Sequence, residues 1–170
     1  MLSVYSLIIS VMLAGNWRVL ESRNLWLPIS SGANLRLIIK ATLYGFIIIS
    51  LVIPLSIMLP ISISYGINPT MPLTVLISTS LIGCSVNLYT AVKFLKSGRG
   101  GSPSFLVGWL SMLLSLLFLS PIYLPVTLAL LLRSNEIINV MIFAGTLFYS
   151  VIIVRLFLNL IERNIYSIEI

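Results

Sequence analysis

Residues that could perform acid–base, nucleophilic or metal chemistry are scarce in this chain. It has no histidine and no aspartate, its single cysteine is Cys84, and its four carboxylates are Glu21, Glu136, Glu162 and Glu169. A zinc site needs three or four Cys, His or carboxylate ligands, and histidine-ligated haem needs a histidine. The sequence therefore predicts a protein that is not an enzyme, with no catalytic residue, no metal site and no cofactor.

The elements that position these few groups are strongly apolar. Of 170 residues, 59% are hydrophobic and 8% are charged, whereas a soluble domain is about a quarter charged. A membrane-spanning helix needs about 20 apolar residues, and continuous rather than alternating apolar runs favour helices. The predicted fold is all-α, a polytopic transmembrane helix bundle of about five spans in a single domain. We expect these spans at about 2–17, 37–63, 73–92, 105–132 and 137–160.

Two features affect how these stretches can cross a membrane. The first stretch is short, but no Lys or Arg precedes Arg18 and no small-residue cleavage pattern follows it. We therefore expect it to be retained rather than removed as a signal peptide. Prolines within or near the ends of the second and fourth stretches should kink or end those helices; they are Pro54, Pro60, Pro121 and Pro125.

Lys and Arg are unevenly distributed between the segments that join the predicted spans. The first and third connections carry Arg18, Arg23, Arg36, Lys40, Lys93, Lys96 and Arg99, with Glu21 as their only acid. Basic residues accumulate on the cytoplasmic side of membrane proteins. We therefore expect the amino terminus outside the cell membrane and the carboxyl terminus in the cytoplasm. The net charge of +6 then reflects topology and attraction to membrane lipids, and we expect no nucleic-acid partner.

The connection from residue 17 to residue 40 is longer and more patterned than a simple loop. Its apolar residues are too many for a free loop, and its polar residues are too many for a span. Such a mixture is typical of a helix at the membrane surface. We expect a short amphipathic cytoplasmic helix over residues 18–30, stopped by Pro28. Ser30 or Ser31 would then cap the next helix, which should start near Asn34.

The amino-acid sequence of this segment resembles that of membrane (permease) subunits of type-2 ABC exporters. The resemblance rests on Glu21-Ser22-Arg23-Asn24-Leu25-Trp26-Leu27-Pro28-Ile29-Ser30, followed by Lys40. In that family an acidic residue opens a short cytoplasmic helix, a Leu-Pro-x-Ser turn follows, and a basic residue lies about ten positions on. The glycine-rich basic loop from Lys93 to Ser102 is also similar to a cytoplasmic loop of the family.

The resemblance implies a function, a set of partners and a contact site. The short helix would be the coupling helix that binds a separate ATPase subunit, and a second permease chain, identical or related, would complete the transport pathway. The chain lacks the family's first span, and it has Gly32 and Ala33 where more polar residues are usual. It could be a shortened permease, part of a split one, or a fragment. The expected ATPase contacts are Arg18, Glu21, Arg23, Asn24, Leu25, Trp26 and Leu27.

Two other functions compete with the exporter hypothesis. The chain could be a small accessory or structural subunit of a larger membrane complex, with no transport role of its own. A lipid-modifying enzyme fits poorly, because it needs a nucleophile with a base or a metal site. The long amphipathic segment favours the exporter over the accessory subunit.

The remaining polar residues of the spans are interpreted as packing groups. Small residues give the third span a face suited to helix–helix contact; they are Ser78, Ser80, Gly83 and Ser85. We expect Cys84 to be a small packing residue, and Asn87 and Asn159 to form interhelical hydrogen bonds. Arg155 could pair locally with Glu162, two helical turns away.

Overall fold

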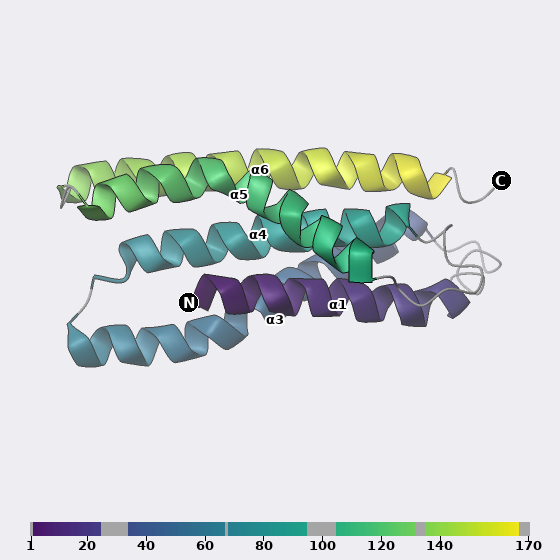
Figure 1. Ribbon diagram of the computed structural model, residues 1–170, viewed down its shortest axis with the longest axis horizontal. Coiled ribbons are helices and arrows are strands. Elements are labelled where there is room, and N and C mark those ends of the chain that lie inside the picture. The colour runs from purple at the N-terminus through teal and green to yellow at the C-terminus, as the bar shows by residue number, and fades with distance from the viewer. Residues whose placement is uncertain (1, 25–33, 67, 95–104, 132–134, 167–170) are drawn as a thin grey trace.

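In the computed structural model, the described residues are 2–24, 34–66, 68–94, 105–131 and 135–166. They form five helices and, within these ranges, no strand. The helices are α1 (Leu2–Asn24), α3 (Leu35–Tyr65), α4 (Thr70–Lys93), α5 (Phe105–Leu131) and α6 (Glu136–Tyr166). They run roughly along one common axis (Figure 1). Helices α3 to α6 are long and apolar enough to cross a membrane, so the predicted all-α helix bundle is confirmed.

Helix α1 differs from the other four in length and position. Its apolar part, Ser3–Asn16, is shorter than the roughly 20 residues that a full span needs. The helix begins part of the way along the bundle and then runs toward the end where α3 starts (Figure 1). It therefore lies beside only part of the length of its neighbours.

The predicted boundary near residue 17 is not a helix end. The α1 backbone continues without interruption through Asn24, because residues 16–24 contain no glycine or proline and include good helix formers. Up to Asn24 the expected surface helix is therefore a continuation of the first helix rather than a separate element. Residues 25–30, with Pro28, lie outside the described residues.

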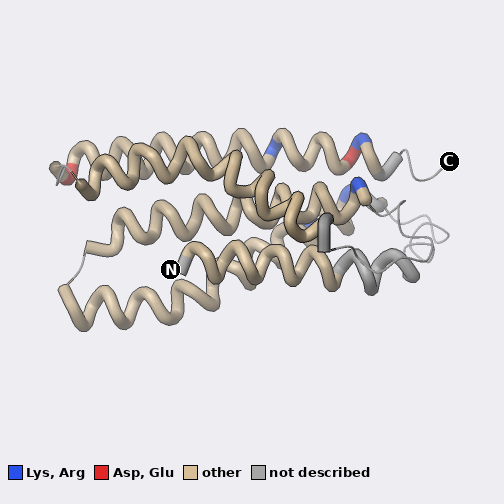
Figure 2. The backbone as a smooth tube through the Cα atoms, viewed as in Figure 1, with Lys and Arg blue, Asp and Glu red and all other residues tan. Residues whose placement is uncertain are grey.

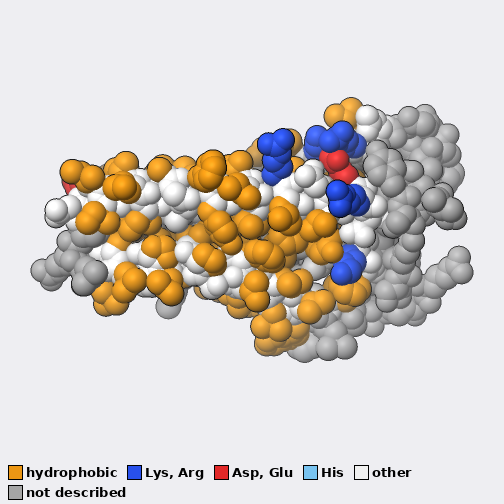
Figure 3. Space-filling view, turned by 90° about the horizontal axis from the view of Figure 1, so that it is seen from above, with side chains coloured by type: hydrophobic (Ala, Val, Ile, Leu, Met, Phe, Trp, Pro, Cys, Tyr) orange, Lys and Arg blue, Asp and Glu red, His pale blue; other side chains and the backbone are white. Residues whose placement is uncertain are grey.

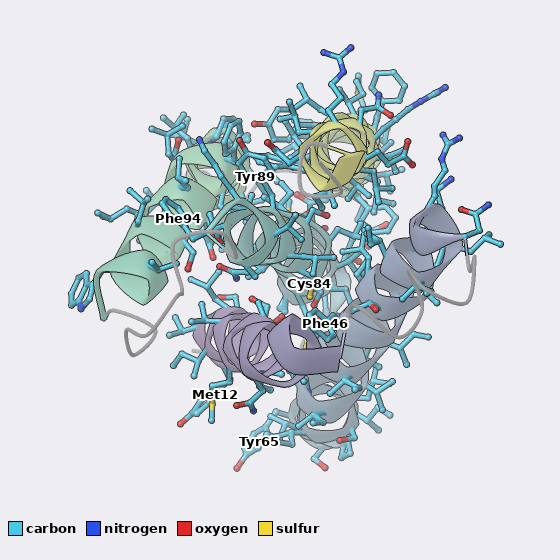
Figure 4. All side chains as sticks on the ribbon, turned by 90° about the vertical axis from the view of Figure 1, so that its right-hand side faces the viewer. Met12, Phe46, Tyr65, Cys84, Tyr89 and Phe94 are labelled. Carbon is cyan, nitrogen blue, oxygen red and sulfur yellow. The ribbon has the colours of Figure 1, made fainter. Side chains whose placement is uncertain are left out.

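Helix α4 occupies the centre of the bundle. Viewed along the bundle axis, it lies between α1, α3, α5 and α6 (Figure 4), and it is by far the most buried of the four long helices. Small side chains let helix backbones approach closely within a membrane. Accordingly, α4 is rich in buried small and polar residues, which are Thr74, Ser78, Thr79, Ser80, Gly83, Cys84, Ser85, Asn87, Thr90 and Ala91.

The prolines bend helices without ending them. Pro54 and Pro60 lie inside α3, and Pro121 and Pro125 lie inside α5. These two helices change direction along their length, whereas α6 is nearly straight (Figures 1 and 2). Proline removes a backbone donor and crowds the preceding turn, which kinks a helix.

The ends of α3 are set by caps rather than by its prolines. The helix ends at Gly66, whose φ of 62° is left-handed and suits glycine. At its other end the cap is Asn34, not Ser30 or Ser31 as predicted. The Asn34 side chain accepts a hydrogen bond from the Arg36 amide at 3.1 Å, which satisfies one of the free donors of the first turn.

Replacing Gly83 with leucine should separate α1 from α4. A Cβ at this position would lie 3.1 Å from Ser10 Oγ and 3.3 Å from Leu7 Cδ1, so the larger side chain must displace α1. Overpacking of this kind costs about 1–3 kcal/mol, and thermal unfolding in detergent should show a lower midpoint. Gly145→Leu is the control, because a Cβ there meets nothing within 4 Å. Equal losses in the two variants would contradict close packing at Gly83.

Candidate functional site

Most charged residues of the described ranges lie toward one end of the bundle (Figure 2). This end, called the basic end below, includes the start of α3 and the ends of α1, α4 and α6. It carries Arg36, Lys40, Lys93, Glu162 and Arg163, and Arg155 lies two turns before Glu162 on α6. At the opposite end, Glu136 opens α6. The fold thus brings to one end Arg36 and Lys40 from the first connection, Lys93 from the third, and Arg163 from the last helix.

A three-residue charge cluster joins α3 to α6 at the basic end. The Arg36 Nε donates a hydrogen bond to Glu162 Oε1 at 2.6 Å, and the Lys40 Nζ lies 3.9 Å from the same oxygen. Arg36 and Lys40 are four residues apart, so they share one face of α3. The Glu162 side chain is only 15% exposed, which weakens screening by solvent and salt. The cluster therefore fixes the start of α3 against the end of α6.

The local pair between Arg155 and Glu162 that their spacing allows does not form. Glu162 pairs with α3 instead, because Ile39 and Leu43 of α3 and Ile161 of α6 belong to the same buried core cluster, which brings Arg36 within reach of Glu162. An ion pair between residues 126 positions apart has no local sequence signature. The sequence indicated only that Arg36, Lys40 and Glu162 should all lie at the cytoplasmic side, with the two basic residues on one face of a helix.

A second set of polar contacts, called the polar seam below, runs between α1, α3 and α4. Ser6 Oγ lies 2.8 Å from Ser80 Oγ, and Asn87 Nδ2 donates to Ser10 Oγ at 2.8 Å. On the α3 side, Ser50 Oγ lies 3.2 Å from Cys84 Sγ. The predicted interhelical role of Asn87 and the packing role of the small α4 residues are confirmed. The same prediction for Asn159 is wrong, because its side chain is exposed on α6 and forms no hydrogen bond with another described residue. Cys84 is fully buried beside Phe46, where α1, α3 and α4 meet (Figure 4).

One acceptor of the polar seam has no partner among the described residues. Asn87 Oδ1 is buried without a hydrogen bond, as is Ser78 Oγ. Exchanging the amide oxygen and nitrogen of Asn87 does not help, because Ser10 Oγ would then face Oδ1 and the amide nitrogen would be left without a partner. The bond from Asn87 to Ser10 is therefore the one that holds the side chain in place. It fixes the position of α1 along α4.

The residues expected to contact an ATPase lie at the end of α1 or beyond it. Arg18, Glu21, Arg23 and Asn24 belong to the last turns of α1, at the basic end of the bundle (Figure 1). Their side chains are not described. Leu25, Trp26 and Leu27 lie outside the described residues. Arg18, Glu21, Arg23 and Asn24 therefore follow directly, on one continuous helix, from the part of α1 that carries Ser6 and Ser10.

The described residues contain no group of three or more His, Cys, Asp or Glu that could hold a metal ion. No protein-family model, curated protein or solved structure matches the chain. The geometry that bears on function is that of the charge cluster, the polar seam and the continuous α1 helix, which runs to the same end of the bundle as the cluster.

Reversing the charges of Arg36 and Glu162 should test the charge cluster. Arg36→Glu and Glu162→Arg should each lower the free energy of unfolding, and the double variant should recover about 1 kcal/mol. The measurement is a double-mutant cycle of thermal unfolding in detergent. The recovered coupling should shrink in 1 M salt, where the screening length is about 3 Å. Strictly additive effects at low salt would show that the two side chains do not interact.

Proposed function

We propose that the chain is the membrane subunit of an ATP-driven ABC exporter that couples to a separate ATPase subunit through residues 18–30. The observation that carries this proposal is the continuity of α1. One helix joins four of the expected ATPase-contact residues, those from Arg18 to Asn24, to Ser6 and Ser10, which are hydrogen-bonded to the central helix. Because an α-helix resists bending along its axis, a displacement of its last turns reaches α4 directly.

The charge cluster provides a second connection from the same segment. Arg36 lies in the first turn of α3, just after the expected coupling segment, and its bond to Glu162 links α3 to α6. Movement of residues 18–30 would therefore act on α1 at one side and on α3 and α6 at the other. ATP binding by the partner would favour one arrangement of these helices over another, which is a shift between populated states.

No residue of the chain needs to perform chemistry in this mechanism. The ATPase supplies the energy, and the transport pathway forms between this chain and a second permease chain, identical or related. The basic end faces the cytoplasm in this proposal, because Lys and Arg accumulate on that side. An ATPase subunit in the cytoplasm would then meet the end of α1.

Cysteine labelling in intact cells should test this orientation. In a Cys84→Ser background, Ser64→Cys places a thiol at the exposed end of α3 and Asn34→Cys places one at the basic end. A membrane-impermeant maleimide should label position 64 in intact cells and position 34 only after permeabilisation. The opposite pattern would reverse the orientation and remove the cytoplasmic coupling segment.

Affinity purification from native membranes in mild detergent should test the ATPase partner. Mass spectrometry should find a stoichiometric ATPase subunit with the tagged chain. Glu21→Arg or Trp26→Ala should reduce its recovery by about tenfold or more, as expected for a central interface residue.

Trp109→Ala is the matched control, because Trp109 is an exposed tryptophan on α5, outside the coupling segment. Recovery of the ATPase should be unchanged in this variant. Purification of the chain with other membrane subunits and no ATPase would contradict the exporter proposal. The chain would then be an accessory subunit.

A further inference from the structure

The exposed side of α6 carries an unusual polar row that leads toward the basic end. Arg155, Asn159 and Arg163 are all exposed, and their spacing of four residues places them on neighbouring turns of one side of the helix. None of the three forms a hydrogen bond or ion pair with another described residue. Glu162, the carboxylate in this region, is mostly buried and engaged by Arg36 and Lys40. The row therefore presents two positive charges and one amide that have no partner among the described residues.

Arg155 lies among apolar side chains rather than at the end of the bundle. Its exposed neighbours on α6 are Val151, Ile152 and Leu156, which are suited to lipid tails. It precedes Glu162 by two turns, about 10 Å along the helix. In the space-filling view, the basic side chains mark the boundary of a broad apolar surface, and one of them lies deeper within it (Figure 3).

An unpaired arginine at such a position needs an anion. Arginine next to lipid tails is costly unless it reaches the interface or is neutralised. Side chains of an α-helix tilt toward its N-terminus, which for α6 is away from the basic end. Arg155 is therefore poorly placed to extend to the interface by itself, and an anion that enters from the basic end would compensate it.

The chemistry of the row fits a phosphate. Each guanidinium offers several N–H donors in a planar fork that matches phosphate oxygens, and the Asn159 amide adds another donor. The surrounding aliphatic side chains fit the acyl or alkyl chains that accompany a lipid phosphate. These aliphatic side chains form no favourable contact with a free phosphate ion.

We infer that the α6 row of Arg155, Asn159 and Arg163 is a binding site for the headgroup of an anionic phospholipid, whose chains lie on the apolar side of α6. The site is separate from the expected ATPase-contact residues and does not depend on the exporter proposal. Arg36 and Lys40, which are 52% and 36% exposed, add positive potential nearby. The bound lipid would hold the end of α6 at a fixed depth in the membrane.

Native mass spectrometry of the purified full-length chain should test the site. The protein is titrated with phosphatidylglycerol and, separately, with phosphatidylcholine of the same chains. One basic residue near the membrane surface is worth about fivefold in binding to anionic lipid. Arg155→Gln should therefore weaken phosphatidylglycerol binding about fivefold, and Arg155→Lys should largely restore it.

The matched control is Lys93→Gln, which removes one charge at the same end of the bundle. Lys93 lies on α4 over the Tyr89 ring, 5.6 Å from its centroid, and its variant should change binding less than twofold. An unchanged unfolding midpoint in detergent should accompany Arg155→Gln, because Arg155 has no partner among the described residues.

Four results would overturn the inference. Equal losses in Arg155→Gln and Lys93→Gln would indicate a general charge effect. Equal binding of the two lipids, or displacement of the lipid by millimolar inorganic phosphate, would also contradict a phospholipid site. The fourth result is loss of a copurifying protein chain in Arg155→Gln without loss of lipid. The last result would assign the row to a protein contact.

Discussion

The hydrogen bonds of helix α4 are the constraint on which the rest of the structure depends. A helix enclosed by four others has no lipid to face, and helix association within a membrane gains little from the hydrophobic effect. Close packing and interhelical hydrogen bonds must then provide the contact energy. In α4 the glycine at position 83 permits close approach of α1, and Asn87 and Ser80 bond to Ser10 and Ser6. The same residues that make α4 the least apolar of the four long helices make it the central one.

The position of α1 follows from this constraint. Its apolar part is too short to be held in place by matching the thickness of the membrane. Its depth must instead be set by the contacts of Ser6, Ser10 and Leu7 with α4. The aliphatic surfaces of α3, α5 and α6 are under no such restriction, and they carry most of the exposed large hydrophobic residues.

The sequence predicted the long helices well because their limits are marked by residues with clear physical effects. The expected spans 37–63, 73–92, 105–132 and 137–160 correspond to α3, α4, α5 and α6. They are bounded by prolines, glycines or charged residues, which do not continue an apolar run. The end of α1 could not be placed in this way, because the change near residue 17 is one of polarity only. Polar residues from Arg18 to Asn24 are compatible with a helix, so the backbone continues.

The partners of polar residues were less predictable than their roles. Asn87 was expected to bond between helices, but its choice of Ser10 depends on how far α1 slides along α4, which no local pattern encodes. The spacing allowed Glu162 to pair along α6 with Arg155, yet it pairs with Arg36, because the start of α3 places that guanidinium within hydrogen-bond distance. That choice has a consequence for Arg155. A carboxylate satisfied by α3 leaves the arginine two turns away without a counter-charge among the described residues, on a surface where neighbouring side chains are aliphatic. Because Glu162 pairs with α3, the positive charge of Arg155 is left to be neutralised by another anion.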